Sequence, residues 1–357
     1  YQEPTAQIIC DAFNGDDTPV PLSSRQLLKR IIKEYNDRGW SPVVAPELEF
    51  YLVAVNTDPD IPLQPPVGRS GRQESGRQAY GIDAVNEFDP IFEDMYDYCE
   101  AQELVVDTLI HESGAAQMEI NFLHGDAIDL ADQVYLFKRT MREAAHRHGI
   151  YATFMAKPMS DEPGSAMHIH QSLEDAEGRN LFGTSEGGNS ALFMHFIAGL
   201  QKYTPAVTAL LAPNVNSYRR LTFGESAPRN VQWGVENRTC GLRVPFSEPS
   251  ARRVENRFAG ADANPYLALA ATLACGYLGM LEKLEPMQEM KASAYDLPYS
   301  LPRSLEESLS HLEQCEPIKD MLGERFIRAF VAVKRKEYET YFGVISRWER
   351  EFLLLNV

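Results

Sequence analysis

The chain has 357 residues, 44% of them hydrophobic, which is enough to bury a sizeable core. Its formal net charge of −17 argues against a surface for nucleic acid or for an anionic membrane. The longest apolar run, residues 267–281, contains glycines and is too short to span a bilayer, so it is expected to form a buried helix.

Five cysteines lie far apart along the chain: Cys10, Cys99, Cys240, Cys275 and Cys315. Their odd number and the lack of a Cys-x-x-Cys pair favour reduced thiols over a zinc site or a disulfide framework. We therefore expect a cytoplasmic protein. Because the chain opens on Tyr1, we also expect further residues upstream of it.

Hydrophobic periodicity and turn residues predict an α+β chain in which helices and strands are unevenly mixed. The expected helices cover 25–38, 88–102, 129–148, 189–203, 204–211, 265–283, 303–313 and 324–352. The expected strands cover 43–55, 104–111, 116–122, 150–156, 165–173, 229–235, 239–245 and 252–258. The Pro-, Gly-, Arg- and Ser-rich segment 56–86 is expected to be a long mobile loop near the functional site.

Four strand-like stretches place ionisable residues at every second position: 46–50, 117–121, 167–170 and 253–257. Residues i and i+2 of a strand point to the same face. The four strands side by side would form a sheet with one apolar face on the core and one charged face lining a cavity. An ordinary half-exposed antiparallel sheet also alternates in this way. The bias toward Glu, His and Arg, with few Thr or Ser, favours a metal and phosphate site.

The charged face offers six candidate metal ligands: Glu47, Glu49, Glu112, Glu119, His168 and Glu255. Oxygen donors with a single imidazole suit Mg²⁺ or Mn²⁺ better than Zn²⁺. Six ligands are enough for two divalent ions. Cations would also relieve the repulsion that raises the pKa of clustered carboxylates.

Five arginines follow in the sequence: Arg220, Arg238, Arg243, Arg253 and Arg257. Their planar donor groups suit carboxylate and phosphate. Any one of them could instead form a surface ion pair, but their crowding within 219–257 favours a site. Acids, imidazole and guanidinium together indicate phosphoryl transfer from a nucleotide to a carboxylate.

Six sequence blocks, in order, resemble the catalytic domain of glutamine synthetases: 44–50, 111–119, 157–159, 164–170, 237–238 and 252–267. The resemblance extends over nearly the whole chain, so residues 1–357 are expected to form one such domain, a curved antiparallel sheet flanked by helices. It also implies a homo-oligomer of stacked hexameric rings, a dodecamer. In that family, the N-terminal β-grasp domain of a neighbouring subunit closes each site, and we expect this domain upstream of the present sequence.

The resemblance implies an ATP-dependent ligase that phosphorylates the γ-carboxylate of glutamate before a nitrogen nucleophile attacks the acyl phosphate. It assigns one set of ligands to the metal nearer the glutamate: Glu49, Glu112 and Glu119. It assigns a second set to the metal nearer the ATP phosphates: Glu47, His168 and Glu255.

The resemblance also assigns the substrate contacts. Residues that would meet glutamate, the nitrogen nucleophile or the transferring phosphate are Gly164, Arg220, Ser226 and Arg257. Residues that would lie toward the nucleotide are His170, Ser172, Arg243 and Arg253. Arg238 would stabilise the departing phosphoryl charge, and Arg238, Glu112 and Arg220 are the expected catalytic residues.

One departure from the family bears on the nucleophile. Ammonia-using members carry a Gly-Tyr-Glu-Ala-Pro flap whose glutamate helps to bind ammonium, whereas residues 224–228 read Gly-Glu-Ser-Ala-Pro here. Ser226 takes the place of that glutamate, although a one-residue slip would restore Glu225 to it. A short neutral side chain would hold ammonium weakly and leave more room. Pro163 and Ser250 also replace an asparagine and a lysine that are usual in the family.

We therefore expect a ligase that joins glutamate to an alkylamine or polyamine, in the manner of γ-glutamylpolyamine synthetases. The sequence does not identify the amine. The nearest alternative is glutamine synthetase acting on ammonia. A non-catalytic structural or regulatory member of the family is a third reading, which the six filled ligand positions disfavour.

Overall fold

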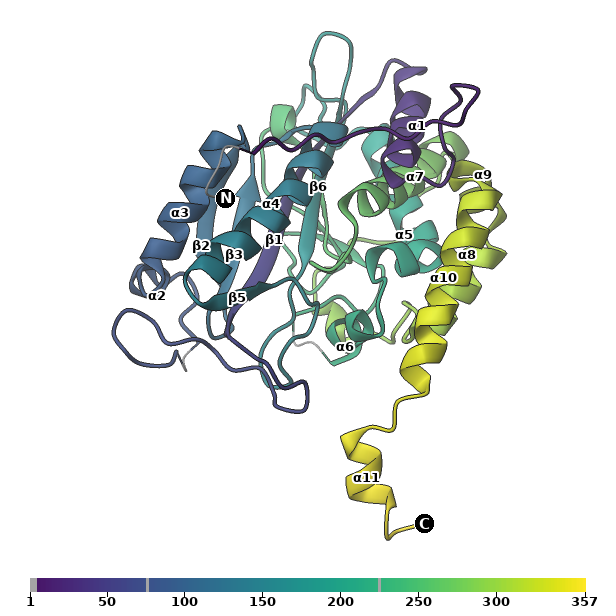
Figure 1. Ribbon diagram of the computed structural model, residues 1–357. Coiled ribbons are helices and arrows are strands. Elements are labelled where there is room, and N and C mark those ends of the chain that lie inside the picture. The colour runs from purple at the N-terminus through teal and green to yellow at the C-terminus, as the bar shows by residue number, and fades with distance from the viewer. Residues whose placement is uncertain (1–4, 75–76, 224–225) are drawn as a thin grey trace.

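The computed structural model describes residues 5–74, 77–223 and 226–357 (Figure 1). Within these residues nine strands form one sheet. The strands are β1 (Ser41–Ala54), β2 (Val106–His111), β3 (Gln117–Phe122), β4 (Gly125–Asp126), β5 (Ile150–Thr153), β6 (Met167–Glu174), β7 (Trp233–Val235), β8 (Leu242–Val244) and β9 (Val254–Asn256).

The sheet is open and mostly antiparallel. Its main path runs β2-β3-β1-β6-β9-β8-β7, while β4 and β5 pair with the two ends of the long strand β1. Among the strands of the described residues, β7 and β8 pair in parallel and the other pairs are antiparallel. Together with the helices this sheet confirms the predicted α+β class.

The described part of the chain also contains eleven α-helices. They are α1 (Ser24–Asn36), α2 (Ile82–Asn86), α3 (Asp89–Ala101), α4 (Ala127–Arg147), α5 (Ala191–Leu211), α6 (Val215–Phe223), α7 (Pro265–Glu282), α8 (Leu305–Gln314), α9 (Glu316–Leu322), α10 (Glu324–Phe342) and α11 (Arg347–Leu353). None of them is long and apolar enough to cross a membrane.

The apolar face of the sheet packs against α4, and α3 lies beside α4 (Figure 1). Phe137 of α4 meets Phe50 of β1 and Phe122 of β3, with ring centroids 6.2 and 5.5 Å apart. Leu48, which alternates with the charged residues of β1, is fully buried. The hydrophobic core therefore fixes which face of β1 is left for the polar groups.

The register of the strands gathers the charged residues on the opposite face, as the alternation predicts. Glu47 of β1 lies opposite His168 of β6, and Glu49 lies opposite Glu119 of β3. His170, two residues after His168, lies opposite Glu255 of β9. Residues directly opposite one another share a face, so four separate strands contribute to one charged surface.

Two helix predictions have the wrong boundaries. The segment expected to form one helix over 324–352 is two helices, because α10 ends at its cap Gly343 and Ser346 opens α11 with a capping box. The helices expected over 189–203 and 204–211 are a single helix, α5, which contains Pro205. Sequence reasoning also missed α2, α6 and α9. Of these, α6 matters most because it carries Arg220.

Several strand predictions were too long. The strands expected over 229–235, 239–245 and 252–258 are three residues each, and the strand expected over 150–156 ends at Thr153. The expected loop 56–86 includes α2 and a β-bridge between Val67 and Gln73. Such short strands are fixed by their partners rather than by their own periodicity.

Candidate active site

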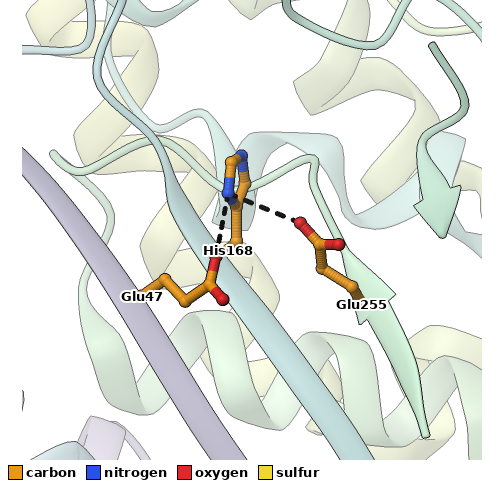
Figure 2. Close-up of side chains that lie close together, drawn as sticks. All are labelled: Glu47, His168 and Glu255. Carbon is orange, nitrogen blue, oxygen red and sulfur yellow. Dashed lines mark ion pairs between the residues drawn. The ribbon is translucent and has the colours of Figure 1, made fainter. Parts of the chain in front are cut away.

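Three neighbouring strands of the sheet bring Glu47, His168 and Glu255 together (Figure 2). The imidazole Nδ1 of His168 lies 3.4 Å from a carboxylate oxygen of Glu47 and 3.6 Å from one of Glu255. One potential ligand atom from each residue lies within 4.8 Å of the other two. The set expected from the resemblance for the metal nearer the ATP phosphates is thus assembled in space.

A second group shares His168 with the first. Glu49, Glu119 and His168 also offer ligand atoms within 4.8 Å of one another. Glu112, the third residue expected for this set, joins neither group, but its charge helps to raise the pKa of both Glu49 and Glu119. It lies in the turn that follows β2.

The protonation preferences of these groups fit a cation site. Burial and then repulsion by Glu112 raise the pKa of Glu49 to about 8, and burial with repulsion by Glu47 raises the pKa of Glu119 to about 9. Burial lowers the pKa of His168 to about 4, which leaves the neutral imidazole that ligates metals. A divalent cation would keep both carboxylates ionised.

Glu255 is fully buried and is held by two guanidinium groups. Its carboxylate oxygens lie 2.5 Å from Nη1 of Arg243 and 2.6 Å from Nη1 of Arg257. Burial opposes its ionisation, but the charges of Arg257 and His168 bring its pKa down to about 2. Arg243, expected near the nucleotide, therefore contacts Glu255 and the exposed Glu236.

The remaining arginines take different positions. Arg220 is buried, and its guanidinium donates to the carbonyl oxygens of Phe258 and Arg257, both at 2.9 Å. Arg238 is exposed, and its charge lowers the pKa of Glu112 against the larger opposing effect of burial. The three arginines expected around glutamate and the transferring phosphate thus lie around the carboxylate cluster.

A small cavity of about 40 Å³ adjoins the second carboxylate group. Four of its lining residues are those expected near glutamate, the nucleophile or the transferring phosphate: Gly164, Arg220, Ser226 and Arg257. Two more, Glu49 and His168, belong to the second carboxylate group. A Cβ on Gly164 would lie 2.6 Å from the Ala156 carbonyl oxygen and 2.7 Å from the Arg220 side chain, so the backbone approach requires glycine. Glu225 lies outside the described residues.

A second, larger cavity of about 360 Å³ has Glu47 in its lining. Its lining includes His170, Ser172 and Arg253, three of the four residues expected near the nucleotide, and Ser250. Nε2 of His170 lies 2.7 Å from Oε1 of Glu47, and Nε of Arg253 lies 3.2 Å from Nδ1 of His170. His170 therefore links Glu47 to Arg253. Arg243, the fourth residue, is not among those that line this cavity.

Sequence reasoning missed two side chains that join the carboxylates to the small cavity. Gln117 donates from Nε2 to Glu49 at 3.4 Å and to the Gly164 carbonyl oxygen at 3.0 Å. The Tyr51 hydroxyl donates to the Pro163 carbonyl oxygen at 2.8 Å. Gln117 lies two residues before Glu119, so the alternation could have found it. Its neutral amide was not counted.

Comparison with known proteins gives a consistent result. Residues 21–353 match the family model described as glutamine synthetase, catalytic domain. Gamma-glutamylputrescine synthetase PuuA of Escherichia coli is 36% identical over 356 residues, which is 98% of this chain and 75% of that protein. A glutamine synthetase of Pyrococcus abyssi is also 36% identical, over 93% of this chain and 74% of that protein.

The solved structure titled "Apo GmaS without ligand" has the same fold, with a TM-score of 0.82 and 30% identity. It covers 94% of this chain and 77% of the other. The family model covers nearly the whole chain, and the relatives match it over most of their own length. The likeness in fold agrees with the likeness in sequence. The chain belongs to the glutamine synthetase family and is an ATP-dependent carbon–nitrogen ligase.

Proposed function

We propose that this chain joins the γ-carboxylate of glutamate to an alkylamine or polyamine, with ATP as co-substrate and γ-glutamyl phosphate as intermediate. One Mg²⁺ or Mn²⁺ ion would be held nearer the glutamate by Glu49, Glu112 and Glu119, and a second nearer the ATP phosphates by Glu47, His168 and Glu255. The support is the donor set itself: buried carboxylates with raised pKa values around a neutral imidazole.

The proposed reaction has two steps. A γ-carboxylate oxygen of glutamate attacks the terminal phosphorus of ATP, and ADP leaves. The amine nitrogen then attacks the acyl carbon, gives up its proton, and expels phosphate, which carries away one oxygen of the original carboxylate. Bound divalent ions would neutralise the reacting oxygens and hold them in line.

The protein's own residues would orient both substrates. Gly164 and the carbonyl oxygen of Pro163 would receive the α-amino group of glutamate, beside Arg220 and Arg257 in the small cavity. Residues of the larger cavity would receive the nucleotide: His170, Ser172 and Arg253. Arg238 would face the departing phosphoryl group, since its charge already acts on Glu112.

Ser226 is the observation that favours an amine over ammonia. It lines the small cavity beside Glu49 and Arg257, where it adds a short neutral hydroxyl and no carboxylate. The comparisons do not decide between the two nucleophiles, because a putrescine ligase and a glutamine synthetase match with equal identity. A cationic ammonium ion would gain less from a hydroxyl than from a carboxylate.

The test measures ADP release by the purified protein with Mg²⁺, ATP and glutamate. Ammonium is compared with methylamine, putrescine and spermidine. We expect turnover with at least one amine and little response to ammonium. A better turnover with ammonium would establish a glutamine synthetase in which Glu225 supplies the flap carboxylate. No turnover with any nucleophile would favour a non-catalytic family member.

Two substitutions separate charge from size at the flap. Ser226→Glu adds a carboxylate and should raise the ratio of ammonium to amine turnover by about tenfold, equivalent to ~1.4 kcal/mol. Ser226→Gln adds the same bulk without the charge, so it should slow amine turnover without raising ammonium turnover. Equal ratios in both variants would mean that Ser226 does not determine the nucleophile.

The assembly and the location are part of the same proposal. We place the chain in the cytoplasm as the catalytic domain of a homo-oligomer of stacked hexameric rings, acting on small molecules. A neighbouring N-terminal β-grasp domain would close the site. The relatives offer support for a further domain, because a quarter of the putrescine ligase lies outside the match.

A further inference from the structure

Glu112 is held differently from the other candidate metal ligands. Glu47, Glu49, Glu119, His168 and Glu255 all lie within strands, whereas Glu112 follows the last residue of β2 and begins the turn to β3. Its backbone N–H donates to the Gln117 carbonyl oxygen at 2.8 Å. Because β2 ends at His111, the direction of Glu112 also depends on side-chain contacts around the turn.

His111 fixes the other peptide group of Glu112. The imidazole Nδ1 of His111 lies 2.7 Å from the Glu112 carbonyl oxygen, and its Nε2 lies 2.7 Å from Oε1 of Glu74. A carbonyl oxygen only accepts, so Nδ1 carries a hydrogen and donates it. The remaining ring nitrogen and the Glu74 carboxyl then share one proton, whichever of the two holds it.

The Glu74–His111 pair is deeply buried. His111 is 1% exposed and Glu74 is 8% exposed. Oε2 of Glu74 is buried and has no hydrogen-bond partner among the described residues. Burying a carboxyl group with one oxygen unpaired costs free energy, so the pair is not explained by stability alone.

Glu74 comes from a segment far from β2 in the sequence. It lies between β1 and α2, beside the bridge of Val67 with Gln73. The same segment reaches β2 a second time, where the Tyr80 N–H donates to the His111 carbonyl oxygen at 2.8 Å. Two contacts with one residue therefore tie this segment to the turn that presents Glu112.

We infer that Glu74 and His111 are positioning residues that set the Glu112 backbone and couple it to the segment between β1 and α2. The inference rests on the proposed role of Glu112 at the metal nearer the glutamate. The segment must be in place for that ligand set to be complete. Glu47, His168 and Glu255 lie within the strands β1, β6 and β9, so we expect their metal site not to depend on the segment.

The test titrates Mn²⁺ into the metal-free full chain by calorimetry. The wild-type protein should bind two ions. Glu74→Ala should weaken one of the two sites by about 10–100-fold, the usual effect of removing a partner that orients a metal ligand, and should leave the other unchanged. Glu74→Gln can still donate to Nε2 of neutral His111 and should stay within about threefold of wild type.

A matched control lies in the same part of the chain. Glu87 accepts a hydrogen bond from the backbone N–H of Ser70 at 3.0 Å. Glu87→Ala should leave both Mn²⁺ sites unchanged. As a second readout, Mn²⁺ should slow tryptic cleavage after Arg69 and Arg72 in the wild-type chain and in Glu74→Gln, but not in Glu74→Ala.

The outcomes separate this inference from the proposed function. Two Mn²⁺ sites in the wild-type chain that Glu74→Ala leaves intact would overturn the inference alone. Equal weakening of both sites would also overturn it, because that would indicate a general loss of structure. A wild-type chain that takes up no Mn²⁺ would overturn the metal assignment and this inference with it.

Discussion

The two regions that supply the candidate site are built by different physical means. Strand register brings Glu47, His168 and Glu255 together from three adjacent strands, and a buried hydrophobic face behind them fixes their direction. Glu112 and Ser226 come instead from a turn and from a flap, and hydrogen bonds between side chains and backbone hold the turn. The first region is thus set by strand register, and the turn in the second is set by individual hydrogen bonds.

The largest expected effect is a loss of stability in the strand-held region, the region of Glu47, His168 and Glu255. Glu255→Gln removes the fully buried carboxylate that pairs with both Arg243 and Arg257, so the free energy of unfolding should fall by about 3–5 kcal/mol. Urea denaturation of the metal-free protein measures this. The matched control is Glu236→Gln, which removes the exposed partner of Arg243 and should cost about 1 kcal/mol or less. Equal losses of unfolding free energy in the two variants would contradict the distinction between the buried and the exposed partner of Arg243.

The second effect lies at the junction of the two regions. Gly164→Ala forces a Cβ against the Ala156 carbonyl oxygen and Arg220, so the backbone around the small cavity must shift. We expect kcat/KM for glutamate to fall by about 10²-fold. Gly15→Ala, where no atom lies within 4 Å of the added Cβ, is the control and should have no effect. Wild-type kinetics in Gly164→Ala would remove Gly164 from the site.

The acids of the second carboxylate group predict a pH dependence. The folded-state pKa values of Glu49 and Glu119, about 8 and about 9, lie above the ordinary value of 4.5. The folded chain therefore binds more protons than the unfolded chain across this range, and its stability falls as the pH rises from about 5 to about 9. Glu255 has the opposite shift, and its contribution is lost only in acid, below about pH 4.5.

The measurement is the Tm of the protein with a chelator and with Mg²⁺ at several pH values. Without metal, Tm should fall by at least about 2 °C between pH 6 and pH 9. Mg²⁺ should raise Tm more at pH 8 than at pH 6, because protons compete with the metal at the lower pH. A Tm that does not respond to Mg²⁺ at either pH would contradict a cation site.

The smallest effect concerns the link between the regions. Tyr51→Phe removes the hydroxyl that holds the Pro163 carbonyl oxygen and should lower the free energy of unfolding by about 1 kcal/mol. The KM for glutamate should rise severalfold while the KM for ATP stays unchanged. Tyr96→Phe, on the surface of α3, serves as the control. A rise in both KM values would indicate a wider disturbance.

The sequence predicted the strand-held region well because its signal is local. Alternation at period two places Glu47 and Glu49, or His168 and His170, on one face wherever the strand lies. The cross-strand register that brings Glu119 opposite Glu49 could only be inferred from the family resemblance.

The region held by the turn was harder to predict, because the contacts that hold it join residues far apart in the sequence. The pairing of Glu74 with His111 joins residues 37 positions apart through a non-repetitive segment, and no periodicity marks it. The helix α6 that carries Arg220 was also missed, and so was the pairing of Arg243 with Glu255. A buried ion pair depends on which strands become neighbours, and a single strand does not reveal that.

The most direct test of the central claim follows the oxygen atoms of the reaction. Glutamate labelled with ¹⁸O in its γ-carboxylate is incubated with the protein, ATP, Mg²⁺ and the best amine. Mass spectrometry then measures the label in phosphate. The proposed acyl phosphate predicts one labelled oxygen in each phosphate released, together with a γ-glutamylamide. Unlabelled phosphate alongside the amide would contradict phosphorylation of the γ-carboxylate.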